Sequence, residues 1–159
     1  MRPVVSCPGN NTCPYGLLNT RTLAEKLDAQ SHNIGFRGAA EPLIDHELCV
    51  KCGACVQRCP AKSMVIESEA LSIDYDKCLS CGVCVRVCPK QALQYGRIGY
   101  HIYVGGKGGR YTNEGEITAT FVTEEQVISY LEAILAVYQE MADQGQRLSA
   151  VISKYGQRR

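Results

Sequence analysis

Ten cysteines are the residues of this sequence best suited to chemistry, and eight of them fall between residues 49 and 88. They form two runs with the same spacing, C-x2-C-x2-C-x3-C-P. The first run is Cys49, Cys52, Cys55 and Cys59, and the second is Cys78, Cys81, Cys84 and Cys88. Thiolates at this spacing are typical of metal ligation, above all of iron–sulfur clusters.

The two runs belong to an internal repeat, because Asp45–Met64 aligns with Asp74–Leu93 at an offset of 29 residues. Three thiolates separated by two residues each can bind three irons of one cubane from a tight loop, whereas the fourth lies past a turn. In a repeat this fourth thiolate ligates the partner cluster. The spacing therefore predicts one [4Fe–4S] cluster on Cys49, Cys52, Cys55 and Cys88 and another on Cys78, Cys81, Cys84 and Cys59.

Zinc ligation and disulfide bonds are the alternatives for these cysteines. A zinc ribbon uses two C-x2-C pairs and gives the third and fourth cysteine of each run no role. Disulfides belong to oxidising compartments, and residues 1–6 lack the apolar stretch of a signal peptide. The pattern favours iron–sulfur clusters over zinc and disulfides. We expect a cytoplasmic protein.

Charge and hydropathy argue against two classes of partner. The 17 basic and 16 acidic residues give a net charge of +1, which supplies no electrostatic reason for nucleic-acid binding. No apolar run approaches the roughly 18 residues of a membrane helix. We therefore expect neither nucleic acid nor membrane as partner, but a redox partner protein or a reductase subunit.

Segments with helix and strand periodicity flank the repeat. Before it, the pattern predicts a helix over residues 20–30 and a turn-rich connection over residues 31–38. After it, residues 98–104 and 117–122 are predicted strands. Helices and strands in this order indicate an α+β fold.

Two helices are predicted at the C-terminal side. Thr123 and Gln126 form a capping box that opens a long helix, for which Gly145 is the expected end. A short helix with apolar residues between 148 and 155 follows. The long helix carries an apolar stripe of Val127, Leu131, Ile134, Tyr138 and Met141.

Residues 45–96 resemble a bacterial two-[4Fe–4S] ferredoxin. The flanks resemble the C-terminal sirohaem and [4Fe–4S] part of dissimilatory or anaerobic sulfite and nitrite reductases. The matching pieces are V-V-S-C-P-G-N-N-T-C-P at 4–14, T-R-T-L-A-E-K-L at 20–27, N-I-G-F-R-G at 33–38, Y-V-G-G-K-G-G-R at 103–110 and the closing helices. In these reductases a ferredoxin unit is inserted between the I-G-F-x-G turn and the glycine-rich strand.

The resemblance implies a domain organisation in three segments. Residues 45–96 would be the ferredoxin domain, inserted into a small αβ half-domain similar to sulfite reductase. That half-domain would consist of residues 1–44, which carry a C-x5-C pair, and residues 97–159, with the strands and C-terminal helices.

The family's sirohaem-coupled cluster takes a C-x5-C pair and a C-x3-C pair. Cys7 and Cys13 match the first pair, but no cysteine lies between Cys13 and Cys49. Two thiolates cannot hold a cubane alone. If the chain is continuous at Gln30–Ser31, we expect two ordinary thiols here, and a third cluster with sirohaem only if the missing ligands are supplied.

The glycine-rich loop between the two predicted strands has two interpretations. Its glycines by themselves favour a hairpin turn, and no G-K-[ST] follows to make it a P-loop. The resemblance adds a second interpretation, in which Lys107 and Arg110 contact a carboxylate of the sirohaem.

The resemblance implies an iron–sulfur protein that passes electrons through two [4Fe–4S] clusters toward a sirohaem centre. That centre would lie in the full protein or in a partner, and any enzyme activity would be that of a sirohaem-dependent sulfite or nitrite reductase. The alternative is a standalone ferredoxin-like carrier or binding subunit without reductase activity.

Overall fold

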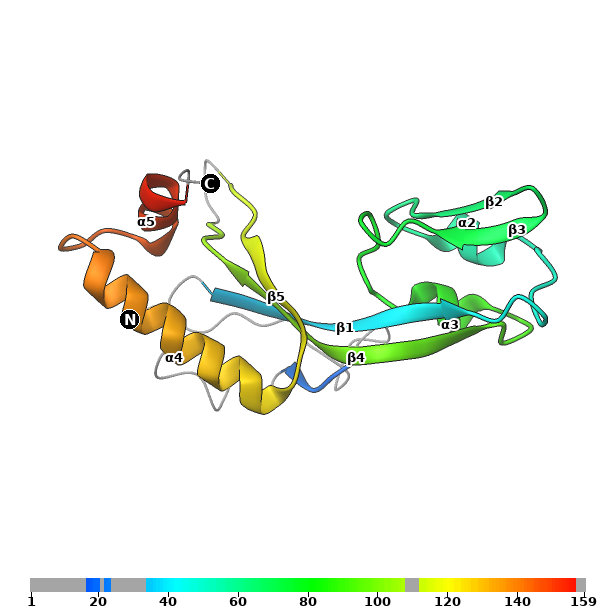
Figure 1. Ribbon diagram of the computed structural model, residues 1–159, viewed down its shortest axis with the longest axis horizontal. Helices are drawn as coiled ribbons and strands as arrows, with labels where there is room; N and C mark the ends of the chain where they lie inside the picture. Colours follow the sequence, from blue (N-terminus) through cyan, green and yellow to red (C-terminus); the bar gives the residue numbers. More distant parts are fainter. Residues whose placement is uncertain (1–16, 21, 24–33, 108–111, 157–159) are drawn as a thin grey trace. The chain divides into compact units, whose positions relative to one another are not determined.

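The computed structural model describes residues 17–20, 22–23, 34–107 and 112–156 (Figure 1). In these ranges helices and strands mix, as the α+β prediction required. The elements are β1 Ile34–Ile44, α2 Ala54–Arg58, β2 Met64–Glu67, β3 Ala70–Ile73, α3 Val83–Val87, β4 Leu93–Val104, β5 Glu116–Val122, α4 Glu124–Met141 and α5 Leu148–Tyr155. None of the helices in the described ranges is long and apolar enough to cross a membrane.

The chain forms two compact units. One consists of residues 39–98 and holds α2, β2, β3 and α3, and the other combines residues 1–38 with 99–159. Strands β1 and β4 contribute residues to both units, and the strand order of their sheet is β1-β4-β5. Strands β2 and β3 form a separate antiparallel hairpin.

The unit with α4 and α5 has an apolar core between its helices and its strands. The capping box of α4 is confirmed, because the Gln126 N–H donates to Thr123 Oγ1 at 3.3 Å and the Thr123 N–H donates to Gln126 Oε1 at 2.9 Å. The helix ends before Gly145, at Met141. The buried residues of the core are Leu23, Phe36, Tyr100, Ile102, Val104, Ala119, Val122, Val127, Leu131 and Leu148.

The predicted turn-rich connection over 31–38 is wrong from residue 34 onward, where β1 begins. Its sequence, I-G-F-R-G-A-A-E-P-L-I, has no period-2 alternation, so the strand depends on pairing with β4 rather than on local preference. β1 is an edge strand, which is where a proline such as Pro42 is tolerated. Of the helix predicted over 20–30, most residues lie outside the described ranges, but Leu23 is fully buried.

We expect the contact between β4 and β5 to be intolerant of any side chain at Gly99. A Cβ there would lie 2.6 Å from the carbonyl carbon of Phe121 and 2.8 Å from the carbonyl oxygen of Val122. Gly99→Ala should lower the free energy of unfolding of this unit by about 1–3 kcal/mol, because the strands must move apart. Denaturant titration followed by far-UV circular dichroism measures the change.

Gly35→Ala is the matched control in β1. A Cβ at Gly35 would meet nothing closer than the Cβ of Tyr103, at 3.9 Å. Equal loss of stability in the two variants would contradict the steric explanation.

Candidate iron–sulfur site

Each cysteine run folds into a loop followed by one short helix. Gly53 precedes α2 with φ 76° and Gly82 precedes α3 with φ 67°, left-handed conformations in which a Cβ is unfavourable. These glycines turn the chain from the loop into the helix. The third cysteine of each run then lies in the helix and is buried, and the fourth is the C-cap residue with extended backbone. The third cysteines are Cys55 and Cys84, and the fourth are Cys59 and Cys88.

A first cavity gathers three cysteines of the first run and the fourth cysteine of the second run. The thiols are those of Cys49, Cys52, Cys55 and Cys88. Its walls are mostly apolar, with side chains from both halves of the repeat and from the hairpin. They include Val50, Ala54, Ile66, Leu71 and Leu93.

A second cavity shows the reciprocal arrangement. It is lined by Cys78, Cys81 and Cys84 of the second run together with Cys59 of the first. Pro42, Met64, Ile73, Leu79 and Val83 supply its apolar walls. The structure therefore brings together the same two groups of four thiols that the spacing predicts, although which atoms they ligate remains a prediction.

The backbone around the cavities repeats like the sequence. Asp45 and Asp74 each accept two backbone N–H groups in a tight turn, at 3.0 and 3.2 Å for Asp45 and at 3.1 and 3.2 Å for Asp74. The N–H of Asp45 donates to the carbonyl oxygen of Ala92 at 2.8 Å, and that of Asp74 to the carbonyl oxygen of Ser63 at 2.7 Å. Each turn thus joins the start of one cysteine loop to the end of the other run.

Burial shapes the acidity of these thiols. It is the largest cause that raises the pKa of Cys84, to about 11, and the neighbouring thiols of Cys81, Cys78 and Cys55 add to it. Burial also raises the pKa of Cys55, with a contribution from the thiols of Cys49 and Cys52. Metal ligation requires the thiolate form, so metal binding here is coupled to proton release.

The half-buried Cys59 behaves differently from the buried Cys55 and Cys84. Burial raises its pKa, but hydrogen bonds from the Ser63 side chain and from the backbone of Ser63, Ala61 and Lys62 outweigh that effect and lower it. Ser63 was not among the residues singled out from the sequence. The signal was present, since Ser63 aligns with Ala92 in the repeat and is a polar residue in an apolar segment.

The residues that line the two cavities fit iron–sulfur clusters. Each cavity offers four soft thiol donors and apolar walls that limit solvent, as cluster ligation requires. Within the described residues no three cysteine, histidine or carboxylate groups converge on the position of a single metal ion. A cubane spreads its four thiolates over the corners of a cluster, and each cavity is lined by four cysteines.

The remaining predicted site residues do not join these cavities in the described ranges. Lys107 is exposed and exchanges two backbone hydrogen bonds with Asn113, at 2.9 and 3.0 Å, which closes a hairpin. Arg110, Cys7 and Cys13 lie outside the described residues. Sirohaem contact by Lys107 and Arg110 and a third cluster on Cys7 and Cys13 therefore stay predictions.

Paired four-thiol cavities of this kind define an iron–sulfur protein. The chain belongs to the family described as "Nitrite and sulphite reductase 4Fe-4S domain", whose pattern matches residues 1–159. The expected resemblance to sulfite and nitrite reductases is thereby confirmed, and with it the assignment to the [4Fe–4S] oxidoreductases of that family.

Two curated relatives cover nearly the whole chain. It is 32% identical over 183 residues to "Coenzyme F420-dependent sulfite reductase" of Methanocaldococcus jannaschii, covering 98% of this chain and 29% of the relative. It is 26% identical over 156 residues to "Nitrite reductase [NAD(P)H]" of Bacillus subtilis, covering 98% of this chain and 15% of the relative. The chain thus spans less than a third of either relative.

The fold also resembles a solved structure, the "Crystal structure of dissimilatory sulfite reductase I (DsrI)". The TM-score is 0.60 at 18% sequence identity, over 94% of this chain and 48% of that chain. This similarity concerns the fold. The alignment with the Methanocaldococcus relative, at 183 residues, is longer than this 159-residue chain, so part of that relative has no counterpart here.

We expect removal of the clusters to unfold residues 45–96. The buried apolar core of this unit is small. It consists of Cys55, Met64, Leu71, Cys84 and Leu93, so two of its members are themselves thiols. Most of its order must therefore come from metal–thiolate bonds. Treatment with a chelator and an oxidant should abolish hydrogen-exchange protection over 45–96.

The α4 unit serves as the internal control for this experiment. Among the described residues its buried core contains no cysteine, so protection of Tyr100–Val104 and of Leu131 should survive. Unchanged protection over 45–96 in the metal-free protein would show that the apolar core alone maintains the unit.

Proposed function

We propose that residues 39–98 hold two [4Fe–4S] clusters with crossed ligation and pass single electrons between them. One cluster would be bound by Cys49, Cys52, Cys55 and Cys88, and the other by Cys78, Cys81, Cys84 and Cys59. The observation that carries the proposal is the presence of the fourth cysteine of each run at the cavity of the other run. A local arrangement would place Cys59 at the first cavity and Cys88 at the second.

The two sites lie close to each other, which electron transfer between them requires. Helices α2 and α3 pack together, and each carries the third cysteine of its run. The thiol of Cys55, at the first cavity, raises the pKa of Cys84, at the second, by electrostatic interaction.

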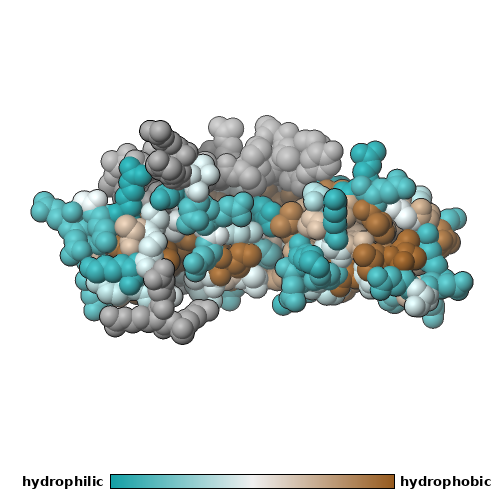
Figure 2. Space-filling model, turned by 90° about the horizontal axis from the view of Figure 1, so that it is seen from above, coloured by the Kyte–Doolittle hydropathy of each residue, from teal (hydrophilic) through white to brown (hydrophobic). Residues whose placement is uncertain are grey.

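Apolar side chains surround the cysteine loops at the surface of this unit. Figure 2 shows brown, hydrophobic side chains among hydrophilic ones in the part formed by this unit, at the right of the view. The exposed apolar residues near the loops include Leu48, Val50, Val65, Ile66 and Leu79. Of these, Val50 and Ile66 line the first cavity and Leu79 lines the second, where they would limit the access of bulk water to the clusters and so tune the reduction potential.

The electrons would go to a sirohaem centre that reduces sulfite or nitrite. Membership of the family and the activities for which the two relatives are named support this destination. The centre would lie in the full protein or in a partner reductase subunit, because this chain spans only a minor part of each relative. The described cysteines are free thiols, which are typical of a reducing compartment, and we propose that the protein acts in the cytoplasm.

Pairs of cysteine substitutions test the crossed ligation. Cys49→Ser with Cys88→Ser removes two ligands of one proposed cluster, so the chain should keep about four irons. Cys49→Ser with Cys59→Ser removes one ligand from each cluster, so both should be damaged and the iron content should fall well below four. Iron and sulfide analysis of anaerobically purified chains measures both.

The wild-type chain is the reference, with about eight irons if only the two runs bind clusters and about twelve if a third cluster is present. Local ligation would reverse the behaviour of the two double variants. In that case Cys49→Ser with Cys59→Ser would retain an intact cluster, and the crossed assignment would be wrong.

The destination of the electrons is tested by spectroscopy on the full-length or assembled protein. We expect sharp tetrapyrrole absorption bands over the broad absorption of the clusters, and reoxidation of dithionite-reduced clusters when sulfite or nitrite is added. The double variant Cys49→Ser with Cys88→Ser should slow this reoxidation. An assembled protein with broad absorption only and no response to either anion would identify a carrier without reductase activity.

A further inference from the structure

The two halves of the repeat differ at one buried position beside the fourth cysteine. Ser63 follows Cys59 by four residues, and Ala92 follows Cys88 by four residues. Both side chains are 2% exposed, and both residues line the cavity to which the preceding cysteine belongs. The first half of the repeat thus places a hydroxyl where the second half has a methyl group.

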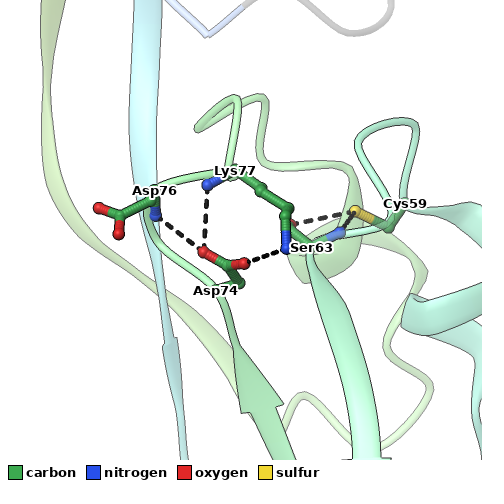
Figure 3. A network of polar contacts seen from close by, with 5 residues as sticks. All are labelled: Cys59, Ser63, Asp74, Asp76 and Lys77. Carbon is green, nitrogen blue, oxygen red and sulfur yellow. Dashed lines mark hydrogen bonds and ion pairs between the residues drawn. The ribbon is translucent and has the colours of Figure 1, made fainter.

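Ser63 contacts the sulfur of Cys59 twice (Figure 3). Its hydroxyl oxygen lies 3.3 Å from Cys59 Sγ, and its backbone N–H donates to the same sulfur at 3.3 Å. When Cys59 is a thiolate it carries no proton, so the hydroxyl must be the donor. Among residues 34–107 no matching hydrogen bond reaches the sulfur of Cys88.

The position of Ser63 is fixed by the turn at Asp74. The Asp74 N–H donates to the Ser63 carbonyl oxygen at 2.7 Å. The carboxylate of Asp74 accepts the N–H groups of Asp76 and Lys77 and pairs with the Lys77 ammonium at 2.7 Å, as Figure 3 shows. In the turn at Asp45, which is equivalent to the turn at Asp74, Leu48 takes the place of Lys77. The Asp74–Lys77 ion pair therefore has no counterpart there.

We propose that Ser63 raises the reduction potential of the cluster bound by Cys59, Cys78, Cys81 and Cys84 above that of the other cluster. This inference rests on the proposed function, because it requires both clusters. Ser63 acts as a positioning residue through the Cys59 sulfur. The electron then resides preferentially on the Cys59 cluster, and the cluster on Cys49, Cys52, Cys55 and Cys88 is the donor side of the pair.

The physical cause is the extra negative charge of the reduced state. A one-electron donor of low potential reduces a [4Fe–4S] cluster from the 2+ to the 1+ state, with no bond formed or broken and no proton transferred. Part of the added charge falls on the cysteine sulfurs. A hydrogen bond to sulfur is stronger when that sulfur is more negative, so it stabilises the reduced state and raises the potential.

Two further features differ between the cavities, and they act in opposite directions. The Ser80 N–H donates to the sulfur of Cys78 at 3.4 Å, which favours reduction of the same cluster. Lys51 and Lys90 line the other cavity, where positive charge favours reduction of that cluster. Both lysines are exposed and Lys51 pairs with Glu69 at 3.7 Å, so solvent and salt screen them, whereas the Ser63 hydroxyl is buried.

The test is a potentiometric titration of the full chain, followed by electron paramagnetic resonance, for the wild type and Ser63→Ala. The substitution removes the hydroxyl but leaves the backbone N–H of residue 63. At a fixed ambient potential we expect the ratio of reduced to oxidised Cys59 cluster to fall about tenfold. For a one-electron couple this corresponds to a midpoint about 59 mV lower. High salt during the titration suppresses the contribution of the two lysines.

Two variants separate the hydroxyl from a packing effect. Ser63→Thr keeps a hydroxyl and should leave the midpoint close to that of the wild type. Ala92→Ser, the matched change in the other half, should leave the midpoint of the Cys59 cluster unchanged. A purely structural role of Ser63 would lower the melting temperature of Ser63→Ala without a shift of midpoint, and that result would overturn the inference.

The double variant Cys49→Ser with Cys88→Ser assigns the midpoints, because only the Cys59 cluster should remain in it. Adding Ser63→Ala to that background should lower the single remaining midpoint by the same amount. A background with no intact cluster, together with fewer than about eight irons in the wild type, contradicts the proposed function itself. If both clusters are intact and Ser63→Ala shifts neither midpoint potential, only the role of Ser63 is contradicted.

Discussion

The arrangement of residues 39–98 depends on the burial of thiols in a unit with little apolar core of its own. Cys55 and Cys84 occupy core positions that aliphatic side chains would fill in a protein without metal. Burial raises their pKa, so as protonated thiols they add little to stability beyond their small apolar volume. In the proposed clusters, metal–thiolate bonds would turn these positions into cross-links between the two halves of the repeat. Gly53 and Gly82, with their left-handed backbone conformation, and the short helices that follow them orient the sulfurs toward the cavities.

Crossing of the fourth cysteine makes the two halves of the repeat interdependent. Cys59 ends α2 but lies at the cavity of the second run, and Cys88 ends α3 but lies at that of the first. Neither half could complete its cluster alone. The same exchange occurs in the backbone, where the turns at Asp45 and Asp74 bond to residues of the opposite half. With crossed ligation, a change in either half would therefore affect the cluster of the other half as well.

The sequence predicted the parts of the structure that depend on local spacing. The grouping of the eight cysteines around two cavities follows from the repeat, and the start of α4 follows from Thr123 and Gln126, because a capping box needs no tertiary partner. The start of β1 at Ile34 and of β4 at Leu93 could not be predicted, since two glycines interrupt β1 and its pairing partner lies far along the chain. The repeat aligns Ser63 with Ala92 and so marks a difference between the halves, but the contact of Ser63 with the Cys59 sulfur is visible only in the fold.

A repeat with equal halves would give two equivalent clusters and no preferred direction for an electron. Here the halves share the cysteines, the glycines and the aspartate turns, so these shared features cannot distinguish one cluster from the other. The distinction must arise where the halves differ, and differences at the surface count for little because solvent screens them. Position 63, equivalent to 92, combines a difference in polarity with nearly complete burial and direct contact with a ligand sulfur. On this proposal the duplicated cysteine repeat would acquire direction through a buried hydroxyl, supported by the Ser80 N–H at the same cavity, with no change to the cysteines themselves.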